Sequence, residues 1–150
     1  HNQLSSLDVT KNTALTELEC YGNQLTSLDV SKNTALTNLR CGDNELTSLD
    51  VTQNTALASL WCESNRLTSL DISKNTALTK LYCYGNQLTS LDVSKNTALT
   101  ELWCSDNQFT AAEMNKIYEA LPTVESGYLQ CNELGNWSIA EQKGWNVSFY

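Results

Sequence analysis

The chain has 150 residues, of which 41% are hydrophobic and one is proline, and its formal net charge is −8 at pH 7. This length and composition predict a single folded domain without a low-complexity linker. The negative charge argues against nucleic acid as a partner, and the lack of a long apolar run argues against insertion into a membrane.

A phrase of 21 residues recurs along most of the chain, and a cysteine marks its period. Each copy reads L-T-S-L-D-[VI]-[ST]-[KQ]-N-T-A-L-x-x-L-x-C-x-x-N-x. Complete copies begin at Leu25, Leu46, Leu67 and Leu88. A partial copy begins at Leu4, and a diverging copy begins at Phe109. A period of about 20 to 50 residues indicates stacked units that bury their apolar faces only against their neighbours.

Each copy contains two shorter segments in which apolar residues alternate with other residues. In the coil that begins at Leu25, we expect strands at residues 28–30 and 39–41, followed by turns at Asn33 and Asn44. Successive side chains of a strand point to opposite faces. The Leu, Val and Cys side chains should therefore point into the core, and the residues between them should point outward.

Residues 36–46 fit the pattern L-x-x-L-x-L-x-x-N-x-L, with Cys41 in the third apolar position. Over residues 2 to about 110, the chain resembles the leucine-rich repeat proteins of bacterial cell surfaces, a short-repeat group similar to the internalins. The resemblance implies a curved, mostly β solenoid, a right-handed stack of coils with two short strands each, that binds a macromolecular partner. It also implies a secreted or cell-surface location in a bacterium. Because the match begins at Asn2, in mid-coil, we expect a piece of a longer protein or a processed form.

Two columns of asparagine follow the same period, one in each half of the phrase. They are Asn12, Asn33, Asn54, Asn75, Asn96 and Asn23, Asn44, Asn65, Asn86, Asn107. Tight corners leave backbone groups without partners, and asparagine amides can satisfy them. We interpret both columns as turn-forming residues rather than as binding residues.

The six cysteines do not have the spacing of a metal site. Zinc ligands cluster in sequence, whereas five of these cysteines lie 21 residues apart and His1 is the sole histidine. Disulfides between adjacent coils are conceivable from the Cα separation, but parallel side chains suit the required dihedral angle badly. We therefore expect free thiols that pack as small hydrophobes, and no metal and no cofactor.

A column of aspartate runs along the first half of the phrase, beside columns of serine and threonine. Its members are Asp8, Asp29, Asp50, Asp71 and Asp92. Calcium requires about six to eight oxygen ligands that converge on one ion, and a flat ladder does not converge. A structural role is the simpler interpretation of this column.

Residues 1–108 form the predicted leucine-rich repeat array, and residues 109–150 form a predicted C-terminal α/β capping region of the same domain. Thr110 and Glu113 have the spacing of a capping box, so a helix should follow over residues 111–121. A strand near residues 128–131, a short helix over 138–144 and a final strand over 145–150 should come next. Trp137 and Trp145 are expected to close the end of the core.

The outward columns of the second half-phrase vary from coil to coil, whereas the other columns repeat. Their middle column places Trp61, Tyr82 and Trp103 side by side on consecutive strands. Aromatic residues with a charged rim are typical of a protein-binding surface. The alternative is that these large side chains only shield the strands. The candidate partner-binding residues are Trp61, Tyr82, Trp103, Tyr84, Tyr21, Arg40, Glu63, Lys80, Glu101 and Tyr128.

The sequence contains no pattern that is typical of an enzyme. It has no Ser, His and Asp set and no glycine-rich phosphate loop, so we expect a binding protein without catalysis. The leading hypothesis is a module that binds a protein ligand or mediates adhesion. The alternatives are a glycan-binding module that stacks sugar rings on the aromatic column, and a structural spacer within a longer surface protein.

Overall fold

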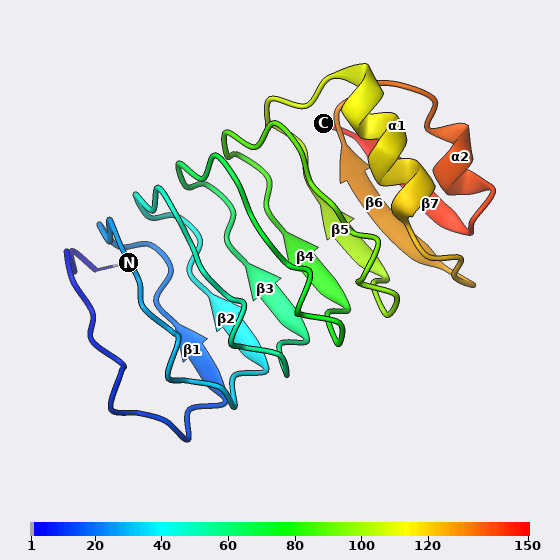
Figure 1. Cartoon of the computed structure of the whole chain (residues 1–150). Coiled ribbons are helices and arrows are strands. Elements are labelled where there is room, and N and C mark those ends of the chain that lie inside the picture. The colour runs from blue at the N-terminus through cyan, green and yellow to red at the C-terminus, as the bar shows by residue number, and fades with distance from the viewer. Residues whose placement is uncertain (1) are drawn as a thin grey trace.

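The computed structural model describes residues 2–150, so His1 lies outside the described residues. A single sheet joins seven parallel strands in the order β1-β2-β3-β4-β5-β6-β7. The strands are β1 (Glu17–Glu19), β2 (Asn38–Arg40), β3 (Ser59–Trp61), β4 (Lys80–Tyr82), β5 (Glu101–Trp103), β6 (Gly127–Cys131) and β7 (Trp145–Phe149). Helix α1 (Ala111–Ala120) precedes β6, and helix α2 (Ser138–Glu141) precedes β7 (Figure 1).

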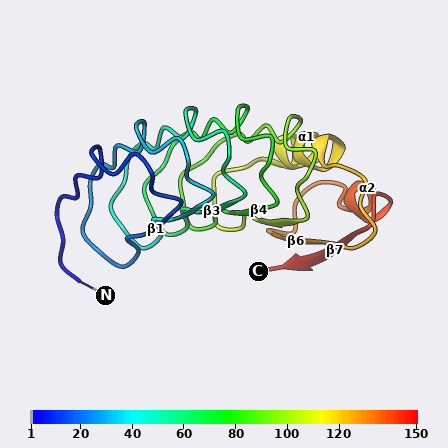
Figure 2. The same ribbon diagram turned by 90° about the horizontal axis from the view of Figure 1, so that it is seen from below.

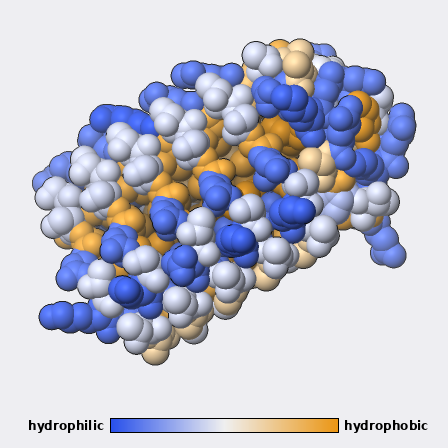
Figure 3. Space-filling view, viewed as in Figure 1, coloured by the Kyte–Doolittle hydropathy of each residue, from blue (hydrophilic) through white to orange (hydrophobic). Residues whose placement is uncertain are grey.

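The first five strands pair in register, each residue with its counterpart one repeat later. Leu39 pairs with Leu60, and Leu60 pairs with Leu81. The strands lie on one side of the array and a row of turns lies on the other (Figure 2). Equivalent residues therefore form rows that cross the coils, which are visible on the surface as polar rows beside an apolar band (Figure 3). The predicted leucine-rich repeat solenoid is confirmed.

The core is built from the repeated apolar columns. Leu39, Leu60 and Leu81 are completely buried, as are the leucines that close each turn, such as Leu57. Burial of each such side chain contributes roughly 1.5–3 kcal/mol relative to exposure. Leu18, which occupies the same column in the first coil, is only partly buried, because no described coil covers its outer side.

The expectation of two strands per coil is wrong, because residues 28–30 and their counterparts form no strand within the part of the chain that the structure describes. Side chains take the hydrogen bonds that a second ladder would need. The Val30 carbonyl accepts from the Asn33 backbone N–H and from Asn54 Nδ2, both at 3.0 Å. Asp29 accepts from the Ser31 N–H at 2.9 Å. The segment is therefore held by its own turn and by the next coil's asparagine.

Both asparagine columns connect adjacent coils, which confirms their structural interpretation. In the second half-phrase, Asn65 Oδ1 accepts from the Leu46 N–H at 3.0 Å, and Nδ2 donates to the Cys41 carbonyl at 3.1 Å. The same Nδ2 also donates to the Cys62 carbonyl at 3.2 Å and to the Glu63 carbonyl at 3.1 Å. One buried side chain thus satisfies backbone groups of three segments that the sheet leaves unpaired.

Replacing Asn65 by alanine should destabilise the whole array. The change leaves the buried Leu46 N–H without a partner and weakens the bonding of the Cys41 carbonyl. We expect the free energy of unfolding to fall by about 3 kcal/mol in urea denaturation. Asn38→Ala is the matched control, because the Asn38 amide donates only to the exposed Glu17 carboxylate, and its cost should stay within about 0.5 kcal/mol. Equal effects of the two changes would contradict this account.

All six cysteines are free and buried, as the sequence predicts. Burial raises the pKa of the Cys41, Cys62 and Cys83 thiols well above the ordinary value. Because the thiolate is the reactive form, these side chains act as small apolar fillers of the core.

Thiol labelling should therefore report unfolding rather than surface chemistry. With a disulfide reagent at neutral pH, the native protein should react slowly, and all six thiols should react after denaturation. Rapid labelling of most thiols in the native protein would contradict the burial of this column.

The C-terminal elements depart from the repeat but continue its sheet. Thr110 Oγ1 accepts from the Glu113 N–H at 3.2 Å, so α1 has the predicted N-cap. Helix α2 is shorter than expected and ends at Glu141. Trp145 is buried in the core, and its indole N–H donates to the Pro122 carbonyl at 2.8 Å. Neither helix is long and apolar enough to cross a membrane.

Candidate functional site

The middle outward column of the strands forms one continuous row of rings. The register pairs Trp61 with Tyr82 and Tyr82 with Trp103, so the three rings lie on consecutive strands. Ring centroids are 4.1 Å apart for Trp61 and Tyr82, and 5.0 Å apart for Tyr82 and Trp103. We call Trp61, Tyr82 and Trp103 the aromatic stripe.

The stripe is less exposed than the sequence predicts. Tyr82 is only 5% exposed, because it packs between the two larger indoles. Burial raises the pKa of Tyr82 far above its ordinary value, and a hydrogen bond to Glu101 adds to the effect. Trp61 and Trp103 are half-buried, so they are the rings that a partner can contact. Tyr82 supports them from between.

The two indole N–H groups differ in their surroundings. Trp61 Nε1 donates to Ser59 Oγ at 2.9 Å, which fixes the ring against its own strand. Trp103 Nε1 is buried and has no acceptor among the described residues. A buried donor without a partner costs about 1–3 kcal/mol. The packing of the Trp103 ring must offset that cost.

Charged residues border the stripe in pairs. The Arg40 guanidinium lies 4.6 Å from the centroid of the Trp61 ring and forms a 3.4 Å ion pair with Glu19. Lys80 Nζ lies 3.0 Å from a Glu101 carboxylate oxygen. The predicted charged rim is therefore present, and its basic members are already paired within the chain.

Two further tyrosines extend the stripe, and a third lies near the other end of the array. The Tyr84 and Tyr128 rings each lie 6.1 Å from the Trp103 ring, so they gather around its end. Tyr128 is 42% exposed. Tyr21 follows β1, and the coils of β2 and β3 separate it from Tyr84. Strand β2 therefore lies between the strand that precedes Tyr21 and β3, which carries Trp61.

Glu63 lies beside the stripe and is only 9% exposed. Its carboxyl group occupies the space that a side chain at Gly42 would fill, since an added Cβ there would collide with Glu63 Oε1. Its Oε2 atom has no hydrogen-bond partner among the described residues. Burial raises the pKa of Glu63, and the neighbouring Asp43 charge adds to this, while Arg40 opposes it. The glycine therefore makes room for a carboxylate in an unfavourable position.

Glu63→Gln should stabilise the protein at neutral pH, because it removes a charge that burial disfavours. The raised pKa means that stability is lost as pH rises above 4.5, the ordinary value for glutamate, through the folded-state pKa. The gain in melting temperature should therefore be present at pH 7 and vanish below pH 4.5, where both states of the wild type carry a protonated Glu63. Calorimetry at both pH values checks this, with the exposed Glu133→Gln as control. A gain that persists at low pH would contradict it.

A pocket that sequence reasoning missed lies at the end of the stripe. Its volume is about 370 Å³. The residues that line it are Ser64, Tyr84, Gly85, Trp103, Ser105, Asp106, Gln130 and Tyr150. Ser64, Gly85 and Asp106 share one column and have positive φ angles of 50°, 65° and 51°. The glycine in this column was a signal of that backbone turn, but nothing in the sequence indicated that Tyr150 returns to it.

Known proteins share this architecture. The family described as Leucine Rich repeats (2 copies) matches residues 76–116. The functional domain of InlJ from Listeria monocytogenes, whose structure includes a cysteine ladder, is 36% identical, covers 94% of this chain and has a TM-score of 0.62. This chain is an internalin-like leucine-rich repeat protein.

Two other structures show the same fold at lower identity. InlF, an internalin from Listeria monocytogenes, is 20% identical, covers 96% of the internalin-like chain and has a TM-score of 0.56. The leucine-rich repeat domain of APL1B is 17% identical, covers 98% of it and has a TM-score of 0.68. The chain spans 36% of the InlJ structure, 47% of the InlF structure and 41% of the APL1B structure. No curated protein matches it in sequence.

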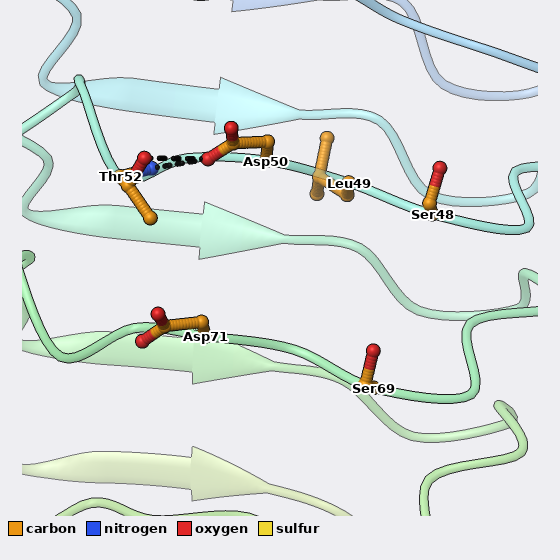
Figure 4. Close-up of a pocket in the computed structure, with 6 residues that line it drawn as sticks. All are labelled: Ser48, Leu49, Asp50, Thr52, Ser69 and Asp71. Carbon is orange, nitrogen blue, oxygen red and sulfur yellow. Dashed lines mark hydrogen bonds between the residues drawn. The ribbon is translucent and has the colours of Figure 1, made fainter.

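The aspartate column of the internalin-like array is used for local turns. Asp50 Oδ1 accepts from the Thr52 N–H at 2.9 Å and from Thr52 Oγ1 at 2.7 Å, at the edge of a hollow between two coils (Figure 4). Asp71 accepts from the Ser73 N–H at 2.9 Å in the same way. These bonds lower the pKa of both carboxyl groups. Each aspartate therefore stabilises its own coil.

Proposed function

We propose that this chain is a macromolecule-binding module that holds a protein ligand on the face of β2 to β5, without catalysis. One observation carries the proposal: the columns that vary between coils gather their aromatic side chains into one stripe, while the columns that repeat build the core and the turns. Half-buried Trp61 and Trp103 are anchors of the kind that supply most binding energy in protein interfaces. The remaining candidate residues border those anchors.

The relatives support a binding role in general terms. Leucine-rich repeat arrays present extended surfaces to other macromolecules, and the internalins of similar structure come from Listeria monocytogenes. We propose adhesion or another protein contact as the role, and a bacterial surface or secreted location. A glycan ligand and a purely structural spacer are the competing outcomes of the experiment below.

We also propose that residues 109–150 act as the capping region of the same domain as residues 1–108. Strand β6 continues the sheet of the array by pairing Leu129 with Leu102. Trp145 closes the apolar cross-section from the far side of β6, and it is only 2% exposed. The expected Trp137 is half-buried and packs against Phe149, with ring centroids 5.7 Å apart. Trp145 therefore supplies the larger part of the closure.

Trp61→Ala and Trp103→Ala should each weaken partner binding by about 2 kcal/mol or more, because each removes a large anchor from the face. Capture from host and bacterial lysates identifies the partner, and titration of that purified partner then gives the affinities. The matched control is the double variant Asp50→Asn with Asp71→Asn. These two side chains lie away from the strands and keep their size, so binding should be nearly unchanged.

Thermal unfolding of each variant separates a lost contact from a lost fold. Equal affinity of the wild type and the two tryptophan variants would remove this face as the site. Capture of a glycan that depends on the same tryptophans would replace the protein ligand by a sugar chain. Capture of nothing would favour the spacer.

A further inference from the structure

The pocket at the end of the aromatic stripe has walls made of rings. Tyr84 and Trp103 lie 6.1 Å apart between centroids, and Tyr150 lines the same hollow. The Tyr150 N–H donates to the Cys131 carbonyl at 3.2 Å, which ties the residue to the end of β6. Its side chain is 79% exposed, so the ring is open to a ligand.

One carboxylate lies in the pocket beside these rings. Asp106 lines the pocket and is exposed. Burial raises the pKa of the Tyr84 hydroxyl, and the negative charges of Glu63 and Asp43 raise it further. Among these three carboxylates, Asp106 is the one that lines the pocket.

Within residues 2–150, no basic side chain lines the pocket to balance these charges. The two basic residues of the strands are engaged elsewhere, Arg40 with Glu19 and Lys80 with Glu101. Nor does Arg66 supply the balance, since it pairs with Glu45.

At the other end of the stripe, a cation of the chain itself lies over one of the rings. There the Arg40 guanidinium lies 4.6 Å from the centroid of Trp61 and pairs with a carboxylate, Glu19. A cation over an aromatic face gains about 0.5–1 kcal/mol at exposed sites and about 2 kcal/mol when desolvated. The pocket has the rings and a carboxylate of that arrangement but lacks the cation.

We propose that this pocket receives an arginine or lysine side chain of the protein ligand, held between the rings of Tyr84, Trp103 and Tyr150 and paired with Asp106. The inference rests on the proposed function, since it names the chemistry of the partner on the same face. The Asp106 carboxylate and the net charge of −8 favour a basic peptide segment over a neutral sugar, because a sugar would leave that carboxylate uncompensated.

The probe is the peptide acetyl-Gly-Arg-Gly-amide, compared with its citrulline counterpart, which has nearly the same shape but no charge. A single side chain in an open pocket should bind with a Kd on the order of 10 mM, within reach of an NMR titration. The arginine peptide should shift the backbone signals of Gly85 and Tyr150 and the Trp103 indole signal, and the citrulline peptide should not. Added salt should weaken binding, as it does for exposed charges.

Two variants test the parts of the pocket separately. Asp106→Asn should weaken binding about fivefold, because it removes the paired charge while asparagine tolerates the positive φ angle at this position. Tyr150→Ala should weaken binding about threefold, and its exposed position protects the fold from the change. Asp71→Asn, a carboxylate on another column, should have no effect.

Equal binding of the two peptides, or no response of the pocket signals to arginine, would overturn the proposal. Shifts of the same signals by chitohexaose without a response to arginine would overturn it in favour of a sugar. The proposed function fails by a different result, the retention of partner affinity in the Trp61 variant. Loss of partner binding in Trp61→Ala together with equal peptide binding would therefore refute the cation pocket alone.

Discussion

The asparagine that reaches from one coil to the next is the interaction on which the rest of the structure depends. A coil of 21 residues cannot bury its own apolar edge, so it is stable only against its neighbours. Asn65 fixes that contact because the oxygen and the nitrogen of its side-chain amide both form hydrogen bonds with backbone groups, across two coils. The first-half column is less complete, since Asn54 Oδ1 is buried without a partner while Nδ2 spans Val30 and Asn33. These hydrogen bonds between coils therefore also align the rows of outward side chains.

The aromatic face contains two groups that are unfavourable for stability. Glu63 is a buried carboxyl group with an unpaired oxygen, and Trp103 has a buried N–H without an acceptor. Glutamine at position 63 would avoid the penalty of the buried charge, whereas the Trp103 ring offsets its own penalty by packing against Tyr82, Tyr84 and Tyr128. Under the proposed function, these two groups are sites where activity costs stability, as is common in natural proteins.

Sequence reasoning was most successful where the repeat itself restricts the answer. A constant period stacks each residue on its counterpart in the next coil. This stacking predicts the inward columns, the in-register strands at Leu39 and Leu60, and the buried thiols. It failed at residues 28–30, because the choice between a strand ladder and a turn depended on side-chain bonds from Asn54, one coil away. It also missed the burial of Tyr82, which depends on the sizes of both neighbouring rings, and the return of Tyr150 toward Tyr84. A local sequence pattern does not predict contacts between segments that are distant in the chain.

The in-register pairing of the strands also fixes the distances between side chains along the array. Adjacent strands of a sheet lie about 4.7–4.9 Å apart, so the distance from the Arg40 and Trp61 contact to the Asp106 pocket is set by the number of intervening coils. Duplication or loss of one phrase between them would move the two ends by one such step while leaving each local geometry unchanged. Under the proposed function, array length would therefore select among extended ligands by the spacing of their side chains, without any substitution at either end.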